Sequence, residues 1–253
     1  MTDLYVQRDQ PPGVPPLQLT GERTLPDVPE ENYWFRRHLV VYEWASLLLA
    51  GRRVVDLACG EGYGTALLGT TAASAVGVDA NPEAFEHARA RYTRPGVTFE
   101  RDMVERWSGD VDAVVFLQTI EHVPDPDAVL EHVRALIGER GIAIVSTPNV
   151  LTLAPKGAER SGNPWHVREY RPQEYRALCS AHFAQVELYG LFHARKLRAH
   201  ELALRAGWDR VHAALRITTP FYDRFVPAIS TRDFALRPDP LERALDLVAV
   251  LRP

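Results

Sequence analysis

The segment from Val54 to Gly64 reads V-V-D-L-A-C-G-E-G-Y-G, an apolar run followed by glycines in the spacing G-x-G-x-G. Gly60 and Gly62 would let the backbone turn tightly and approach a ligand without a Cβ in the way. A helix expected to begin at Gly64 would offer unpaired backbone N–H groups to the same ligand. The segment predicts a nucleotide or nucleoside site, with glycines that serve only strand and helix packing as the alternative.

Two carboxylates narrow the choice of ligand. Asp56 precedes the glycine turn, where its charge would repel a pyrophosphate but suit the ammonium group of a methionine moiety. Asp79 lies about 20 residues after the turn, at the end of the next expected strand, where it can accept hydrogen bonds from ribose hydroxyls. The two positions favour a nucleoside without phosphates over a dinucleotide.

A candidate base follows another apolar run. The residues Q-T-I-E-H, from Gln118 to His122, come at the end of the expected strand 111–117, and open α/β sheets bind ligands at the carboxyl ends of their strands. With an unperturbed pKa of about 6.5, His122 is suited to removing a proton from a hydroxyl group of a substrate that accepts a transferred group. A histidine that caps the following turn, or that satisfies a hydrogen bond in the core, is the alternative.

A second histidine lies in the segment N-P-W-H-V-R-E-Y, from Asn163 to Tyr170. Trp165, His166 and Tyr170 combine faces for stacking with edges for hydrogen bonding, which suits a polyhydroxylated or aromatic acceptor. His166 is therefore a second candidate base or a ligand of the acceptor. A structural loop histidine is the alternative.

Short apolar runs rich in β-branched residues alternate with helical patterns along most of the chain. Strands are expected at 54–58, 75–78, 97–99, 111–117, 142–146, 184–191 and 244–251, and helices at 64–68, 82–92, 126–137 and 172–181. Continuous apolar strands separated by helices indicate a sheet that is buried on both faces. The predicted fold class is α/β, a doubly wound, mostly parallel sheet of seven strands.

Segments outside this alternation complete the expected organisation. Residues 1–29 contain six prolines and predict an arm, and residues 30–253 then form a single domain with lid helices at 30–50. Residues 193–230 predict a helical insertion before the last strand. Its basic run is a solvated helix face, with an acceptor groove or a dimer contact as alternatives; the run comprises Arg195, Lys196, Arg198 and His200.

The composition limits the partners and the location of the protein. The 253 residues carry a formal net charge of −4, which offers no basic field to a phosphate backbone, so no nucleic acid is expected. Cys59 and Cys179 are isolated, which argues against a disulfide framework and a cysteine-based zinc site. Because no secretory signal or membrane-spanning run stands out, the sequence predicts a cytoplasmic protein without membrane insertion.

The motif from Val54 to Gly64 resembles the first motif of class I S-adenosylmethionine-dependent methyltransferases, and the similarity extends through most of residues 40–190. The resemblance implies a Rossmann-like methyltransferase fold with S-adenosylmethionine as the cofactor. It also implies that Gly60 and Gly62 line the methionine and ribose part of the cofactor and that Asp79 binds the ribose.

Further cofactor contacts are expected on the same resemblance. It implies that Asp102 accepts a hydrogen bond from the adenine amino group and that Met103 packs on the adenine ring, with Asp102 as a helix N-cap the alternative. Gln118 is expected to face the sulfonium. Arg37 lies where this fold places a lid, and is expected either to pair with the methionine carboxylate or to lie in solvent on an amphipathic helix.

Two segments resemble ubiquinone-type and sugar O-methyltransferases. The first is their E-x-x-E-H-V-x-D-P stretch, whose acidic residues and histidine are implicated in divalent metal binding; Glu121 and His122 match it, whereas Gln118 replaces the first acid. Because Mg²⁺ prefers several oxygen ligands, Mg²⁺ is not predicted and no metal ligands are assigned. The second is N-P-x-H-x-R-x-[YF], which matches residues 163–170 and borders the acceptor pocket in those enzymes.

Together these features predict an O-methyltransferase that transfers a methyl group from S-adenosylmethionine to a hydroxyl of a small molecule, with a histidine as general base. The expected acceptor is a sugar in a polysaccharide precursor, a glycolipid or a glycosylated natural product. A quinone or phenol O-methyltransferase, an NAD-linked oxidoreductase and a non-catalytic nucleoside-binding module are the alternatives. A homodimer is left open.

Overall fold

The computed structural model describes residues 12–14, 16–19, 23–238 and 240–253. The expected arm at residues 1–29 therefore lies partly outside the described residues. Within its described part, Leu17, Leu25 and Val28 are buried and pack together with Leu19. This part of the arm forms a small apolar cluster of its own.

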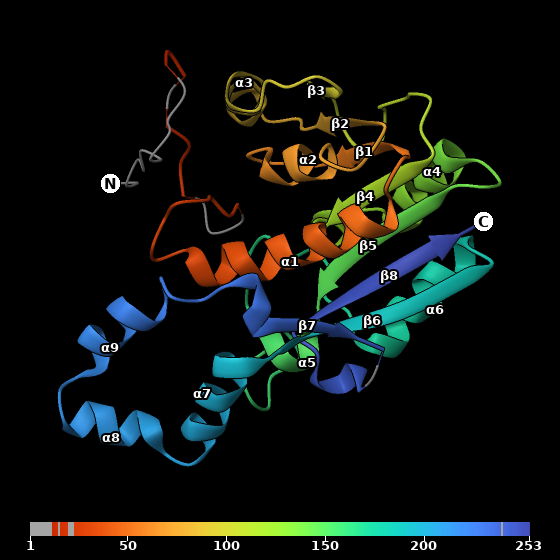
Figure 1. Cartoon of the computed structure of the whole chain (residues 1–253). Helices are drawn as coiled ribbons and strands as arrows, with labels where there is room; N and C mark the ends of the chain where they lie inside the picture. Colours follow the sequence, from red (N-terminus) through yellow and green to blue (C-terminus); the bar gives the residue numbers. More distant parts are fainter. Residues whose placement is uncertain (1–11, 15, 20–22, 239) are drawn as a thin grey trace.

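Eight strands form one sheet in the order β3-β2-β1-β4-β5-β8-β6-β7 (Figure 1). They are β1 (Arg53–Leu57), β2 (Ser74–Val78), β3 (Val97–Glu100), β4 (Ala113–Leu117), β5 (Ile142–Pro148), β6 (Gln185–His193), β7 (Phe234–Arg237) and β8 (Asp246–Arg252). The first five strands are parallel to one another, whereas β8 runs antiparallel to both β5 and β6. The mostly parallel α/β sheet agrees with the predicted fold class.

The prediction of seven strands is wrong by one strand, because β7 was not expected. It contains only four residues and pairs antiparallel with β6 at the edge of the sheet. β3 is equally short, but it contains the β-branched Val97 and Thr98, whereas β7 reads F-A-L-R and has no β-branched residue that would favour a strand.

Helices cover both faces of the sheet. They are α1 (Asn32–Leu48), α2 (Tyr63–Leu68), α3 (Pro82–Arg91), α4 (Pro126–Ile137), α5 (Val150–Leu153), α6 (Pro172–His182), α7 (Arg195–Arg205), α8 (Trp208–Ala214) and α9 (Thr218–Phe225), with single 3₁₀ turns η1 (Ile120–His122), η2 (Thr231–Asp233) and η3 (Leu241–Arg243). One apolar cluster joins the sheet to α4 and α6, and a second joins its other face to α1 and α2. Because β4 is buried on both faces, its five residues are all apolar.

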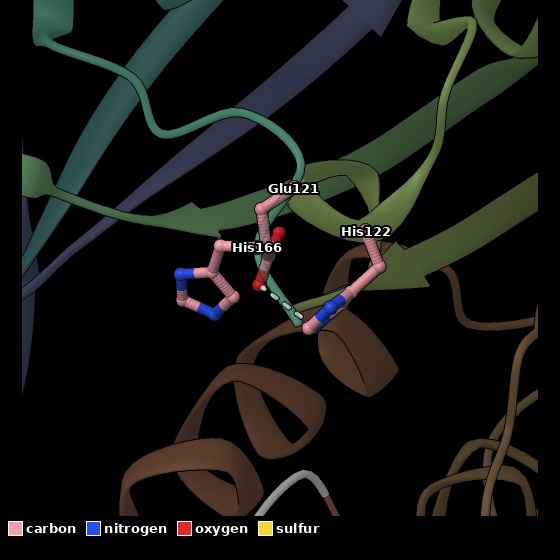
Figure 2. Close-up of side chains that lie close together, drawn as sticks. All are labelled: Glu121, His122 and His166. Atoms are coloured by element: carbon pink, nitrogen blue, oxygen red, sulfur yellow. Dashed lines mark ion pairs between the residues drawn. The ribbon is translucent and has the colours of Figure 1, made fainter. Parts of the chain in front are cut away.

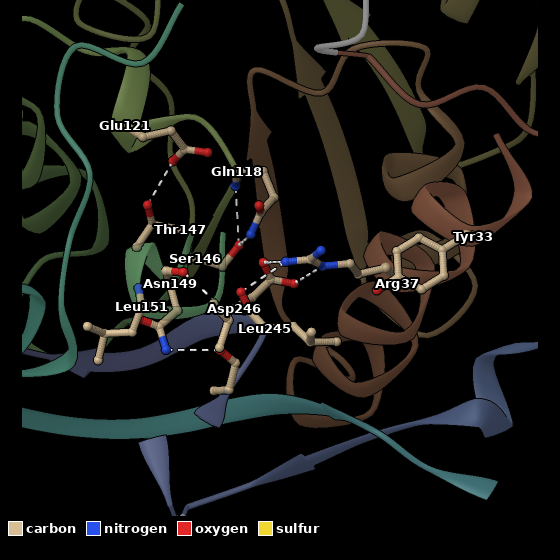
Figure 3. Close-up of polar contacts among 12 residues, drawn as sticks. Tyr33, Arg37, Gln118, Glu121, Ser146, Thr147, Asn149, Leu151, Leu245 and Asp246 are labelled. Carbon is tan, nitrogen blue, oxygen red and sulfur yellow. Dashed lines mark hydrogen bonds and ion pairs between the residues drawn. The ribbon is translucent and has the colours of Figure 1, made fainter. Parts of the chain in front are cut away.

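One helix, α1, occupies the region where lid helices were expected (residues 30–50), and a buried ion pair fastens it to the sheet (Figure 3). The guanidinium of Arg37 donates from Nε to Asp246 Oδ2 over 2.7 Å and from Nη2 to Asp246 Oδ1 over 2.6 Å. Both side chains are almost fully buried. Burial by itself lowers the pKa of Arg37, but the Asp246 carboxylate outweighs it and raises that pKa.

The helical insertion expected at residues 193–230 is present as α7, α8 and α9. In Figure 1, α8 and α9 lie at the lower left, apart from the sheet. The end of the insertion is joined to α1 because Asn32 Nδ2 donates to the backbone oxygens of Val226, over 2.8 Å, and Ile229, over 3.0 Å. Among the residues that the structure describes, no helix has the length and apolar character needed to cross a membrane.

The ion pair of α1 leads to a stability prediction. Replacing Arg37 by Met leaves the buried Asp246 carboxylate without its cation, so we expect a loss of about 3–5 kcal/mol in the free energy of unfolding, measured by urea denaturation. The matched control is Arg89→Met, which breaks the exposed pair with Glu86 and should cost less than about 1 kcal/mol. Equal losses in the two variants would contradict this role of Arg37.

Candidate functional site

The site begins where two parallel strands end. β1 pairs with β2 on one side and with β4 on the other, and Val55 lies level with Val114. The chain leaves β1 toward α2 and β2, and leaves β4 toward α4 and β5, on the other side of the sheet. The two connections diverge and leave a crevice at the carboxyl ends of the strands, which is where open α/β sheets bind ligands.

A cavity of about 440 Å³ occupies this crevice. It is lined by Arg23, Thr24, His38, Tyr42, Ala58, Cys59, Gly60, Glu61, Tyr63, Asp79, Leu117, Gln118, Thr119, His122 and Trp165. We call it the larger cavity. Four of the predicted cofactor and catalytic residues lie on its wall, Gly60, Asp79, Gln118 and His122, and so does Trp165, which was expected to contact the acceptor.

The glycine turn between β1 and α2 has the backbone conformation that its sequence predicts. Gly60 and Gly62 have φ angles of +58° and +96°, in the left-handed region that favours glycine. A Cβ on Gly62 would also lie 2.6 Å from the Cβ of Ala88 on α3. Gly60 lines the larger cavity, whereas Gly62 is needed for the close packing of the turn against α3.

Asp79 is held on the cavity wall by backbone donors. Its Oδ2 accepts from the Gly60 N–H over 2.8 Å, and its Oδ1 accepts from the Asn81 N–H over 2.9 Å. A carboxylate can accept about four hydrogen bonds, so two such contacts orient the group without exhausting it. Asp79 joins the end of β2 to the glycine turn and can also accept from hydroxyls in the cavity.

Asp56 lies beneath the turn and not on the cavity wall. It is completely buried, and its two oxygens accept from Tyr42 Oη over 3.1 Å and from Thr65 Oγ1 over 2.7 Å. Burial raises the pKa of Asp56 to about 7, although both hydrogen bonds act in the opposite direction. Its contacts fasten α1 and α2 to β1. Asp56 therefore supports the glycine turn from below, whereas the sequence predicted direct contact with the ligand.

Three further predicted cofactor residues lie outside the wall of the larger cavity. Asp102 accepts from the backbone N–H of Met103 over 2.8 Å, and Met103 has 42% of its surface exposed. Arg37 is engaged by Asp246, which is the physical reason that the structure does not support its expected pairing with the methionine carboxylate.

A second cavity of about 280 Å³ adjoins the first, and we call it the smaller cavity. It is lined by Thr24, Glu31, Trp34, Arg37, His38, Gln118, Glu121, His122, Pro148, Leu153, Asn163 and His166. Thr24, His38, Gln118 and His122 line both cavities. A molecule in one cavity would therefore meet a molecule in the other at this shared wall.

Gln118 is fixed at the shared wall in an unusual conformation. Its φ of +51° lies in the left-handed region, which a non-glycine residue adopts rarely. Its backbone N–H donates to the Ser146 carbonyl over 3.0 Å, and its Nε2 donates to Ser146 Oγ over 3.0 Å (Figure 3). The bend directs the chain from β4 into η1, which carries Glu121 and His122.

The two predicted histidines lie next to each other, with ring centroids 5.0 Å apart. His122 Nδ1 lies 3.0 Å from the Trp165 carbonyl, and His166 Nδ1 lies 2.7 Å from Glu169 Oε1. A carbonyl and a carboxylate only accept, so each Nδ1 carries a proton and in the neutral ring the lone pair is on Nε2. Both histidines can therefore act as bases through Nε2.

Glu169 is the carboxylate that orients His166. Burial raises the pKa of Glu169, but hydrogen bonds from Ser161 and His166 outweigh burial and lower this pKa below its ordinary value. The group therefore stays ionised and keeps the proton on His166 Nδ1. A carboxylate behind an imidazole also stabilises the imidazolium that forms when Nε2 takes a proton.

A buried carboxylate, Glu121, lies between the two imidazoles (Figure 2). Its Oε2 accepts from Thr147 Oγ1 over 3.0 Å, and its Oε1 lies 3.9 Å from His122 Nε2. Ligand atoms of Glu121, His122 and His166 all lie within 4.8 Å of one another. Two imidazoles with one carboxylate suit a first-row transition metal better than Mg²⁺, so this donor set does not fit Mg²⁺.

Several residues of the site were not found from the sequence. Thr24 belongs to the expected arm, yet its Oγ1 lies 2.8 Å from Tyr63 Oη and it lines both cavities. His38 lies in the expected lid segment, and burial lowers its pKa to about 4, which keeps this ring neutral. Glu169 lies in the segment that drew attention to His166, so its spacing of three residues from that histidine was the available signal.

Known proteins resemble the chain along most of its length. A family model described as "Methyltransferase domain" matches residues 33–202. A probable S-adenosylmethionine-dependent methyltransferase of Mycolicibacterium smegmatis is 37% identical over 246 residues, which cover 92% of this chain and 94% of that protein. Another, of Mycobacterium tuberculosis, is 36% identical, with 92% of this chain and 89% of that protein covered.

Two further comparisons concern part of the chain and its fold. A ubiquinone biosynthesis O-methyltransferase of Xanthomonas axonopodis pv. citri is 32% identical over 128 residues, which are 47% of this chain and 54% of that protein. A solved methyltransferase structure from Thermotoga maritima, described as a possible histamine N-methyltransferase, has a TM-score of 0.59 at 17% identity, with 88% of this chain and 94% of that chain covered. This likeness confirms the predicted fold.

The buried Asp56 predicts a pH dependence of stability. Its pKa is about 7 when folded and 3.8 in its ordinary state, so folding favours the protonated carboxyl. The stability that Asp56 contributes is full at pH values below 3.8 and is lost as the pH rises toward 7, by about 4 kcal/mol. Asp56→Asn keeps a neutral acceptor and should therefore lose less stability than the wild type between pH 4.5 and pH 7.5, as measured by urea unfolding.

The exposed Asp223 on α9 provides the control, because Asp223→Asn should leave the wild-type pH profile unchanged. Parallel pH profiles for Asp56→Asn and the wild type would contradict the raised pKa of Asp56.

Proposed function

Because the chain belongs to the S-adenosylmethionine-dependent methyltransferases, we propose that it methylates a hydroxyl group of a small molecule, with a histidine as general base. The observation that carries this proposal is the pair of adjoining cavities that share Gln118 and His122. Methyl transfer needs two molecules whose reacting atoms meet, and a shared wall supplies a meeting point. A cytoplasmic location stays a prediction, and a homodimer stays open.

The larger cavity would hold the cofactor. Its wall contains the glycine turn at Gly60, and Asp79 offers acceptors to the ribose hydroxyls. Gln118 would lie at the sulfonium end, next to the smaller cavity. In this arrangement Asp56 and Gly62 support the turn from behind, and the adenine contacts of Asp102 and Met103 stay predictions.

The smaller cavity would hold the acceptor. Trp34 is partly exposed there and offers a face for stacking, while Glu31 and Asn163 add polar groups around it. Such a lining suits a polyhydroxylated ring, and we propose a sugar as the acceptor. A quinone or phenol is the second candidate, because the partial similarity to a ubiquinone O-methyltransferase favours it.

The proposed reaction is a single in-line displacement. The cofactor supplies an electrophilic methyl group and a sulfur leaving group that is already activated. The acceptor oxygen forms a bond to the methyl carbon as the carbon–sulfur bond breaks. The electron pair of the carbon–sulfur bond stays on sulfur. His122 Nε2 accepts the hydroxyl proton, since its Nδ1 proton is held by the Trp165 carbonyl. Orientation of the cofactor and the acceptor by the two cavities would contribute most of the rate acceleration.

The experiment that tests the function joins binding with turnover. We expect calorimetry to detect binding of S-adenosylmethionine. In a separate turnover assay, run with and without EDTA, we expect the protein to release S-adenosylhomocysteine when sugars are offered as acceptors. Turnover of phenols and not of sugars would select the second acceptor class. Binding without turnover of any acceptor would favour a non-catalytic nucleoside-binding module, and absence of binding would contradict the proposal altogether.

The role of His122 has its own test. Removing a general base lowers the rate by about 10²–10⁴-fold, so His122→Ala should lose turnover to this extent while its affinity for S-adenosylmethionine, measured by calorimetry, changes little. The matched control is His182→Ala, since His182 lies on α6 and pairs with Asp127. Full activity of His122→Ala together with inactivity of His166→Ala would transfer the role to His166.

A further inference from the structure

The helical insertion exposes apolar side chains that the rest of the domain does not cover. Large apolar residues are exposed at five places within it: Leu202, Leu204, Val211, Leu215 and Ile217. Leu215 has 62% of its surface exposed. Single exposed leucines are ordinary, but five within a segment of 16 residues mark an interaction surface.

The same insertion is basic, although the whole chain has a net charge of −4. Residues 195–226 contain seven arginines and lysines against three aspartates and glutamates. Two of the seven make ion pairs, Arg205 with Glu201 and Lys196 with Asp233. The other five cations form no ion pair with the described part of the chain; they are Arg195, Arg198, Arg210, Arg216 and Arg224.

Helix α7 has two different faces, one toward the hollow beside α9 and one that is basic and exposed. Leu197, His200, Glu201 and Leu204 line a hollow of about 290 Å³ toward α9, which the side chains of Tyr222 and Phe225 also line. Arg195, Arg198, Leu202 and Arg205 follow one another at spacings of three and four residues, which places them along one other stripe of the helix. That stripe is basic with an exposed leucine at its middle.

Helix α8 and the turn after it repeat this combination. Val211 and Leu215 are four residues apart and therefore share a face, and both are exposed. Arg210 precedes the pair and Arg216 follows it, both exposed. The helix lies apart from the sheet in Figure 1, and within the described part of the chain it packs mainly against α7 and α9.

We propose that the insertion formed by α7, α8 and α9 docks on a membrane surface that contains anionic lipids. Arginines interleaved with leucine and valine suit this partner, because the guanidinium groups bind lipid phosphates while the apolar side chains enter the boundary of the acyl chains. A nucleic acid would satisfy the arginines and leave the apolar residues exposed. The negative charge of the rest of the chain would orient the basic insertion toward such a surface.

The experiment measures binding of the full-length protein to vesicles by sedimentation. Vesicles of phosphatidylcholine mixed with phosphatidylglycerol should bind the protein at least tenfold more strongly than vesicles of phosphatidylcholine alone. Added salt should weaken the difference, since it screens exposed charges. Equal binding to both vesicle types, or absence of binding, would overturn the proposal.

Two double variants connect the binding to the insertion. Arg210→Gln with Arg216→Gln should weaken binding about fivefold for each charge removed. Val211→Ser with Leu215→Ser should weaken it about tenfold. All four residues are exposed, so the variants should fold.

The matched controls are Leu47→Ser on α1, where the side chain is 75% exposed, and Arg134→Gln on α4. Controls that lose as much binding as the double variants would overturn the proposal. A different result would also overturn the proposal: the protein forms dimers in solution, the double variant Val211→Ser with Leu215→Ser is monomeric, and the protein does not bind vesicles. That result would assign the exposed face to a second copy of the chain.

Discussion

The parallel pairing of β1 with β4 is the constraint on which the site depends. Hydrogen bonds between parallel strands bring the carboxyl ends of both strands to the same edge of the sheet, so the glycine turn after β1 and the η1 turn after β4 face each other across the crevice. The larger cavity opens between these turns. A shift in the register between β1 and β4 would move Gly60 away from Gln118. It would thereby separate the candidate cofactor-binding residues from the candidate bases.

Hydrogen bonds from buried groups then hold each wall of the crevice. Asp79 fixes the glycine turn to β2, and Ser146 fixes Gln118 to β5. The Arg37–Asp246 pair fastens α1 at the start of β8. Because a buried charge without a partner is costly, such contacts favour one arrangement of the walls. Preorganised walls are what a reaction that depends on orientation requires.

Much of the fold was predictable because its signals are local. Continuous apolar runs such as β4 show a strand that is buried on both faces, and glycines at positive φ mark the turn after β1. The candidate histidines could be found in the same way, since each lies in a short motif. The strand β7 was missed because its sequence, F-A-L-R, has no β-branched residue, whereas the equally short β3 contains Val97 and Thr98.

The partners of individual side chains could not be predicted, since they come from distant parts of the chain. Asp246 lies 209 residues from Arg37 along the sequence, and Tyr42 reaches Asp56 from a different element. A carboxylate next to a glycine turn shows no sign in the sequence of whether it points into the cavity or under the turn. The contact of His122 Nδ1 with the Trp165 carbonyl likewise comes from a distant loop, whereas the contact of His166 Nδ1 with Glu169 spans only three residues and had a local signal.

The most direct measurement of the central claim is a crystal structure of the protein with S-adenosylhomocysteine. The account predicts the nucleoside in the larger cavity, with its ribose at Asp79 and its sulfur beside Gln118 at the wall shared with the smaller cavity. A nucleoside bound in the smaller cavity, or a sulfur atom directed away from His122, would contradict the account.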